Sequence, residues 1–185
     1  ISLQRVYALN TRLQELLGGG YQVREEGLCG RTTVYEDRLE PDRCGLDHIR
    51  GAVEKNGPLD LLIIMLGSND CKAQFGASAA EIAEGLRQVM EKAKESGAGD
   101  FRVLLVAPAV MTERIMHSGF GEEFDQRSIE VSKELAGAYE ALAKKCGCDF
   151  LDGTKVTQVS EIDGLHLDAQ GHGRLAEAVV KYLQK

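Results

Sequence analysis

The sequence predicts an α/β protein in which a parallel sheet is packed between helices, and two patterns in its 185 residues support this fold class. Continuous apolar runs of strand length, clearest at residues 59–66 and 101–107, are typical of parallel strands buried on both faces. Between them, apolar residues recur three and four positions apart, which predicts helices. Strands that alternate with helices indicate βαβ units and therefore a parallel sheet with helices on both sides.

Weaker strand signals lie at residues 23–25 and 149–151, and residues 111–124 predict a loop after a strand, where α/β proteins place their ligands. Four stripes of apolar side chains predict helices: Val6, Leu9, Leu13, Leu16 and Leu17, ending at the glycines 18–20; Ile82, Leu86, Val89, Met90 and Ala93, closed by Gly97; Val131, Leu135, Tyr139, Leu142 and Cys146; and Leu175, Ala178, Val179 and Leu183.

The order of these elements is unusual because a helix comes first, with no strand before it. In a doubly wound sheet the first strand usually lies centrally, so its neighbours would otherwise have unpaired edges in the middle of the sheet. We therefore expect a strand upstream of Ile1, and we treat residues 1–185 as a single domain that is incomplete at its N-terminus.

Composition excludes several classes of partner. The net charge is −7 and the longest run of basic residues is Lys144-Lys145, which argues against a nucleic-acid partner or an anionic membrane surface. No stretch approaches the roughly 20 apolar residues that span a bilayer. The five cysteines show no framework spacing and predict reduced thiols in a cytoplasmic protein. Cys146-Gly147-Cys148 could hold a metal or form a redox pair, or it could simply end a helix before a strand.

Asp163 and His166 are candidates for acid–base chemistry. Their three-residue offset on a turn can bring the carboxylate to the imidazole, where it fixes the tautomer and stabilises the imidazolium ion. The same spacing is frequent by chance, and a surface turn before the last helix explains it equally well. Asp168 is the better candidate for the cap of that helix.

Two Gly-containing segments are candidates for an oxyanion hole. Gly67-Ser68-Asn69-Asp70 follows the apolar run 59–66, where the Asn69 amide could donate to an oxyanion. Gly30 follows the weak strand at 23–25 and could offer its backbone N–H to the same oxyanion. Both segments also fit ordinary turns, for which Gly, Ser, Asn and Asp are the usual residues.

Taken together, these segments resemble the SGNH hydrolases, also called the GDSL-like esterase/lipase superfamily. Residues 25–34 (EEGLCGRTTV) and 58–70 (PLDLLIIMLGSND) are especially similar to its arylesterase-like branch. The closing block of the family is similar to residues 163–168 (DGLHLD), followed by Gly171-His172. The likeness covers nearly the whole chain, and the three blocks together are far more specific than any one of them.

The resemblance implies a three-layer α/β/α sandwich with a flavodoxin-like sheet. It implies that the Gly30 N–H and the Asn69 side chain are the oxyanion donors, and that His166, oriented by Asp163, is the general base and then acid. It further implies a serine esterase that cleaves small acyl esters of aryl or alkyl alcohols through an acyl-enzyme, without a metal or cofactor. Its partner would be a small-molecule ester, and a homo-oligomer is plausible.

One block of the family has no counterpart. The Gly-Asp-Ser block, which carries the nucleophile after the first strand, is absent; Ser2 imitates its end but follows Ile1, and the place of Ser68 in its block is structural. A thiol at Cys29 or Cys71 is a weaker candidate. We therefore expect the nucleophilic serine upstream of Ile1.

Two other functions remain open. Without an attacking hydroxyl, the same fold could be a catalytically inactive protein that binds an ester or a carboxylate. A flavodoxin-like or receiver-like module would share the fold class, but it gives no reason for Asp163 and His166.

Overall fold

A computed structural model, which describes residues 9–97 and 99–184, contains a three-stranded parallel sheet in the order β1-β2-β3. The strands are β1 (Leu61–Ile64), β2 (Arg102–Ala107) and β3 (Asp149–Asp152). Leu62 lies opposite Val103, and Leu105 lies opposite Phe150. The parallel α/β fold expected from the apolar runs is confirmed.

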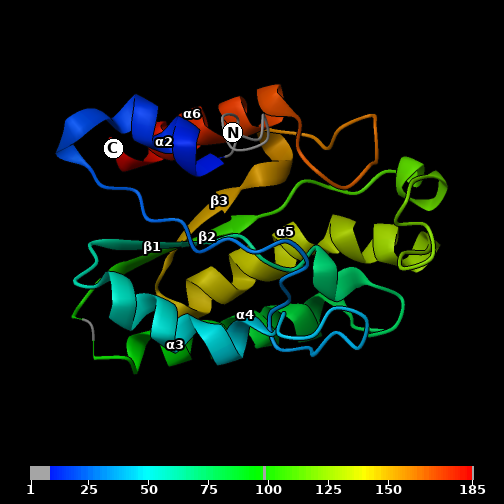
Figure 1. The fold of residues 1–185 in the computed structure, drawn as a ribbon, viewed down its shortest axis with the longest axis horizontal. Helices are drawn as coiled ribbons and strands as arrows, with labels where there is room; N and C mark the ends of the chain where they lie inside the picture. Colours follow the sequence, from blue (N-terminus) through cyan, green and yellow to red (C-terminus); the bar gives the residue numbers. More distant parts are fainter. Residues whose placement is uncertain (1–8, 98, 185) are drawn as a thin grey trace.

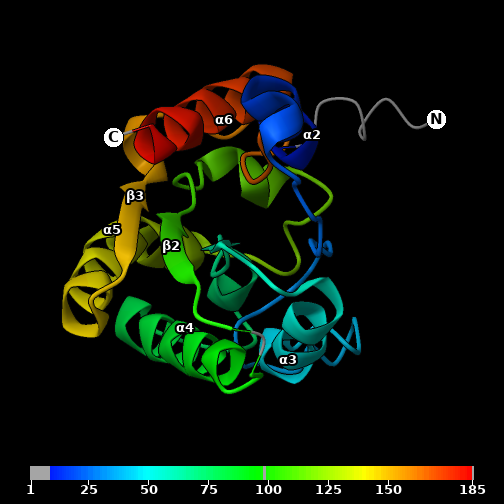
Figure 2. The same ribbon diagram turned by 90° about the vertical axis from the view of Figure 1, so that its left-hand side faces the viewer.

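Helices cover both faces of this sheet, as Figures 1 and 2 show. On one face lie α2 (Leu9–Leu17) and α6 (Ala169–Leu183). On the other lie α3 (Gly45–Asn56), α4 (Ala79–Lys94) and α5 (Gln126–Cys146). Short 3₁₀ helices stand in the connections: η1 (Gly18–Gly20), η2 (Asn69–Cys71), η3 (Glu113–His117) and η4 (Gly153–Lys155).

The central strand β2 explains why two helical layers are needed. Its side chains alternate between the faces, so Leu104 and Val106 pack with α2 and α6, while Val103 and Leu105 pack with the helices of the other layer. Leu104, Leu105 and Val106 are fully buried. Each such side chain contributes about 1.5–3 kcal/mol of burial free energy, which makes β2 the core of the sandwich.

Local signals fix the ends of the long helices. The Ser78 side chain accepts from the Glu81 N–H in a capping box, and Asp125 does the same with Ser128 at the start of α5. Asp168 accepts from the Gly171 N–H at 2.7 Å, so the cap predicted for the last helix is confirmed. At the other end of α5, Gly147 adopts a left-handed φ of 65°.

One expectation about elements was wrong, and one helix was missed. Residues 23–25 form no strand: the segment after α2 runs along the side of the molecule toward α3 (Figure 2) without joining the sheet ladder. Conversely, α3 was not anticipated, because its apolar stripe is only Leu46, Ile49 and Val53 on an otherwise polar segment.

The edge of β1 also bears on the expected first strand. Among the described residues β1 pairs with β2 alone, so its opposite edge has no strand partner. Three of the four β1 residues are only half-buried, although the run is apolar throughout. A strand next to β1 would complete their burial. Val6, Ile1 and Ser2 lie outside the described residues.

Candidate active site

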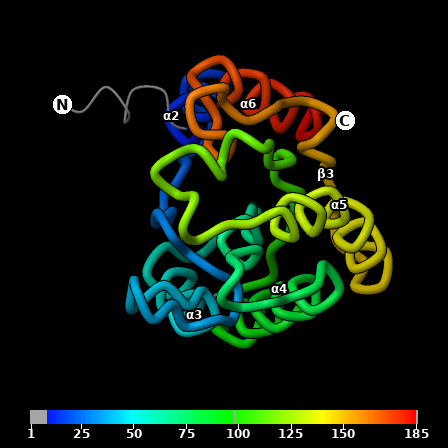
Figure 3. The backbone as a smooth tube through the Cα atoms, turned by 90° about the vertical axis from the view of Figure 1, so that its right-hand side faces the viewer, coloured from blue at the N-terminus to red at the C-terminus, as the bar shows by residue number. Residues whose placement is uncertain are grey.

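The segments that carry Asn69, Asp163 and His166 follow strands of the sheet and lie at its carboxyl edge, on the right-hand side of Figure 1. The segment with Asn69 follows β1, residues 111–124 follow β2, and the segment with Asp163 and His166 comes after β3 and η4. Figure 3 looks onto this end of the molecule, where the chain between β2 and α5 runs between α6 on one side and α3 and α4 on the other. Parallel strands place their connecting loops together at this edge, where α/β proteins bind ligands.

The structure brings Asp163 and His166 into direct contact. The His166 Nδ1 atom lies 2.8 Å from Asp163 Oδ2. Asp163 Oδ1 accepts the backbone N–H groups of Leu165 and His166, each at 2.9 Å. A carboxylate at Nδ1 holds the proton on that nitrogen and leaves Nε2 free to accept one. The pair therefore has the geometry of an oriented general base.

The electrostatics of Asp163 suit this arrangement. Burial acts to raise the pKa of Asp163, but the hydrogen bonds from the Leu165 and His166 backbones and from the His166 ring outweigh it and hold the pKa below its usual value. The carboxylate is consequently ionised at neutral pH. It can stabilise positive charge on the imidazole after a proton transfer.

The loop that carries His166 is attached to the segment after β2. Gly164 has a left-handed φ of 71°, and a Cβ there would lie 2.6 Å from the Thr112 hydroxyl and 2.7 Å from the Ile115 nitrogen. Thr112 donates its backbone N–H to the Gly164 carbonyl at 3.1 Å. The Phe120 ring lies against the His166 ring, with centroids 5.2 Å apart. The imidazole, whose side chain is 48% exposed, is thus held along one side and open on another.

Asn69 and Gly30 lie on two loops that are joined directly. Asn69 Nδ2 donates one hydrogen to the Arg31 carbonyl at 3.0 Å, which leaves its second N–H for another acceptor. The Gly30 N–H has no hydrogen-bond partner among residues 9–97 and 99–184. Gly30 also has a φ of 77°, and a Cβ there would collide with the Glu40 carboxylate. The left-handed backbone therefore favours glycine at this position, and its N–H, unpaired among the described residues, lies on the loop whose Arg31 carbonyl Asn69 contacts.

Asp70 forms a second connection between these loops, which the sequence did not reveal. It is fully buried and accepts from the Thr33 backbone N–H at 2.8 Å and from the Thr33 hydroxyl. Burial raises the pKa of Asp70 to about 6 despite these hydrogen bonds. The residue ties the Gly30 loop to the Asn69 loop and leaves one carboxylate oxygen, Oδ2, unpaired among the described residues.

The raised pKa of Asp70 predicts a specific pH dependence of stability. Because the pKa is higher in the folded than in the unfolded chain, the contribution of Asp70 to stability is complete below pH 3.8 and is lost as pH rises through 6. In Asp70→Asn the acceptor for Thr33 remains but the titration disappears. Urea unfolding from pH 4 to 8 should show the stability of Asp70→Asn rising relative to that of the wild type by about 2 kcal/mol between pH 4 and 7. A difference that does not change with pH would contradict this assignment.

The remaining candidates are less well placed. Cys71 is buried, its thiol donates to the Gly67 carbonyl at 3.3 Å, and burial raises its pKa to about 12, so it holds little thiolate. Cys29 is exposed. Of the two other histidines near this edge of the sheet, His117 in η3 is exposed and His172 in α6 is half-buried. Burial lowers the pKa of His172. Within the described part of the chain, no serine hydroxyl is hydrogen-bonded to the His166 ring, and Ser2 lies outside it.

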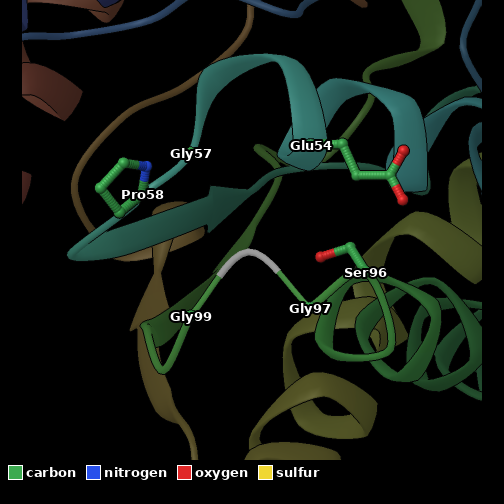
Figure 4. Close-up of a pocket in the computed structure, with 6 residues that line it drawn as sticks. All are labelled: Glu54, Gly57, Pro58, Ser96, Gly97 and Gly99. Carbon is green, nitrogen blue, oxygen red and sulfur yellow. The ribbon is translucent and has the colours of Figure 1, made fainter.

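The described residues contain no group of three or more His, Cys, Asp or Glu side chains arranged to hold a metal ion. They also contain no helix long and apolar enough to cross a membrane. A hollow of about 490 Å³ lies at the opposite end of the sheet, near the starts of β1 and β2 (Figure 4). It is lined by Glu54, Gly57, Pro58, Ser96, Gly97 and Gly99, none of which belongs to the site.

Comparison with known proteins identifies the family of the chain. The model of the GDSL-like Lipase/Acylhydrolase family matches residues 4–174. Among solved structures, a carbohydrate acetylesterase from Sinorhizobium meliloti, Est24, is 30% identical, with a TM-score of 0.89 over 100% of this chain and 87% of that one. The aryl esterase of M. smegmatis is 29% identical, with a TM-score of 0.90 over 97% of this chain and 85% of that one.

A putative arylesterase from Agrobacterium tumefaciens is 34% identical, with a TM-score of 0.84 over 97% of this chain and 86% of that one. None of the curated proteins compared with the chain matches it. The family match covers most of the chain, and the structural neighbours are esterases. The chain therefore belongs to the GDSL-like lipase/acylhydrolase family, in the arylesterase-like branch of the SGNH hydrolases, and is a carboxylic ester hydrolase by class.

Proposed function

We propose that the protein hydrolyses esters of small acyl groups through an acyl-enzyme, with His166 as general base and acid. The observation that carries this proposal is the 2.8 Å contact between His166 Nδ1 and Asp163 Oδ2 at the carboxyl edge of the sheet. It leaves Nε2 facing away from the carboxylate, where a nucleophile can give up its proton.

The reaction begins when a serine hydroxyl attacks the ester carbonyl and His166 Nε2 takes its proton. Asp163 stabilises the imidazolium ion, and the Gly30 N–H and Asn69 Nδ2 donate to the oxyanion of the tetrahedral intermediate. His166 then protonates the departing alcohol. In the second half, His166 activates a water that attacks the acyl-enzyme, and the serine regains its proton from the imidazolium ion as the carboxylic acid leaves.

We place the nucleophile on a strand that pairs with the open edge of β1. That edge has no partner among the described residues, and a parallel strand there would end beside Asn69, which follows β1. A serine at the carboxyl end of such a strand would stand between the Gly30 and Asn69 donors. The proposal of a domain completed by a strand before residue 1 rests on the same edge.

The names of two structural neighbours bear on the acyl and alcohol parts of the substrate. The neighbours include a carbohydrate acetylesterase and aryl esterases, which differ in the alcohol part of their substrates. We propose that this enzyme likewise accepts short acyl chains and that residues 111–124, next to His166, select the alcohol. We further propose that it works in the cytoplasm, since all five cysteines are free thiols. We also propose that the protein forms a homo-oligomer and that it does not bind nucleic acid.

A fluorophosphonate probe tests the function directly, because it reacts with activated serines. The purified protein is treated with the probe and digested, and the labelled peptide is sequenced by mass spectrometry. One labelled serine outside residues 9–184, together with hydrolysis of 4-nitrophenyl acetate, is the expected result. Absence of both label and hydrolysis would overturn the proposal and favour the alternative, an inactive protein that binds an ester or carboxylate in the same site.

A further inference from the structure

A buried lysine next to the site has no part in the mechanism described above. Lys72 directly follows η2, and its side chain is only 3% exposed. Its Nζ atom lies 2.6 Å from Asp37 Oδ2, 2.6 Å from Glu123 Oε2 and 3.6 Å from Glu40 Oε2. Lysine is rarely buried to this degree unless it is paired.

The principal partner of Lys72 is a firmly ionised carboxylate. Asp37 is fully buried, and its Oδ1 atom accepts from the Leu39 N–H at 2.9 Å and from Gln74 Nε2 at 3.0 Å. Burial alone would raise the pKa of Asp37, but the hydrogen bonds from Lys72, Leu39 and Gln74 lower it to about 2. Both members of the pair are therefore charged throughout the neutral range.

The ion pairs of Lys72 with Asp37 and Glu40 connect it to the Gly30 loop. Asp37 and Glu40 lie on the segment that follows Gly30, and the Glu40 carboxylate lies against Gly30, where the Cβ of any other residue would be. The Lys72 backbone N–H donates to the Asn69 carbonyl at 3.2 Å. One residue thus touches the loops of both candidate oxyanion donors.

The ion pair of Lys72 with Glu123 connects it to the segment that packs against His166. Glu123 lies three residues after Phe120, whose ring packs on the His166 ring. The Ala73 N–H donates to the Glu123 carbonyl at 2.9 Å, so side chain and backbone both hold this segment. Lys72 is therefore the point at which three loops of the site are joined.

Stability alone is a weak reason for such an arrangement. Removing two charges from water costs several kcal/mol per ion, and apolar replacement of a buried ion pair is often neutral or stabilising. A buried cation that joins three loops does, however, define their relative geometry. A displacement of about 1 Å at a catalytic group can cost roughly a hundredfold in rate.

We propose that Lys72 is a positioning residue for ester hydrolysis, which sets the Gly30 and Asn69 donors relative to each other and holds the Phe120 segment against His166. This inference rests on the proposed function for its chemistry and on the contacts of Lys72 for its geometry. Lys72 touches no substrate, so its effect is expected in kcat rather than in KM.

The test replaces the pair together, because Lys72→Met alone would leave Asp37 charged and buried. In the full-length protein, Lys72→Met/Asp37→Asn should keep its fold by circular dichroism but lose about 10- to 100-fold in kcat for 4-nitrophenyl acetate, with KM changed less than about threefold. Arg102→Met/Asp149→Asn is the matched control. It removes an ion pair of 2.6 Å at the opposite end of the sheet and should leave kcat unchanged.

A second measurement does not depend on activity. In ¹⁵N NMR spectra, the Gly30 amide and the Asn69 side-chain amide should shift in the Lys72 double variant and stay in place in the control. If the wild type hydrolyses esters and the folded double variant keeps its kcat, the positioning inference is wrong while the function stands. If the wild type is inactive, the function fails, and unchanged Gly30 and Asn69 signals would overturn the inference as well.

Discussion

Replacing His166 by alanine is expected to lower kcat for ester hydrolysis by at least about a thousandfold, with KM little changed. The reason is that only Nε2 of this ring is free to take the nucleophile's proton, since Nδ1 lies 2.8 Å from the Asp163 carboxylate. The side chain is 48% exposed, so its removal should alter the free energy of unfolding by less than about 1 kcal/mol. The measurement is steady-state hydrolysis of 4-nitrophenyl acetate alongside thermal unfolding.

Asp163→Asn tests the same pair by changing the carboxylate that contacts the His166 ring. An asparagine can turn its amide N–H toward Nδ1, which moves the imidazole proton to Nε2 and blocks the base. We therefore expect a loss in kcat similar to that of His166→Ala, and no further loss in the double variant, because the two residues act together. His48→Ala, on the exposed surface of α3, is the control and should be fully active. Independent, multiplying losses for Asp163 and His166 would show that the pair does not act as one.

The sheet was predictable from the sequence because its strands are buried on both faces. The run 101–107 appears as β2 within one residue, since every side chain of the strand from Val103 onward is buried and apolar. The weak signal at 23–25 failed because a strand also needs a partner edge, and none is formed there among the described residues. Helix α3 was missed because only three apolar residues form its buried stripe. That is enough for a helix that packs mainly against α4, but it gives a weak periodic signal in the sequence.

Local spacing likewise determined which parts of the site could be foreseen. Asp163 and His166 are three residues apart on one turn, so their contact follows from short-range geometry. The contacts of Asp70 with Thr33 and of Lys72 with Asp37 span 37 and 35 residues. No periodicity in the sequence predicts such pairs, because they form only when the fold brings two loops to the same edge of the sheet. In the sequence alone, a charged residue that becomes buried cannot be distinguished from one that stays on the surface.

Asn69→Ala is the second large effect that we expect, a loss of about 100- to 1,000-fold in kcat, or roughly 2.7–4 kcal/mol of transition-state stabilisation. Asn69 Nδ2 uses one N–H on the Arg31 carbonyl, and the other remains for the oxyanion. The substitution also removes that contact with Arg31, which should lower the free energy of unfolding by about 0.5–1.5 kcal/mol. A comparison is therefore needed that separates the lost donor from a loosened loop.

Binding of a trifluoromethyl ketone provides that comparison, because its adduct with the nucleophile carries an oxyanion as the transition state does. If Asn69 donates to the oxyanion, Asn69→Ala should weaken this inhibitor by the same factor by which kcat/KM falls, while a product carboxylic acid binds nearly as before. Asn69→Asp keeps the shape but places an acceptor where the donor stood, so it should lose at least as much activity as the alanine variant. Equal weakening of ketone and acid would instead mean that Asn69 acts through the Arg31 contact, and Gly30 would then be the sole donor of this pair.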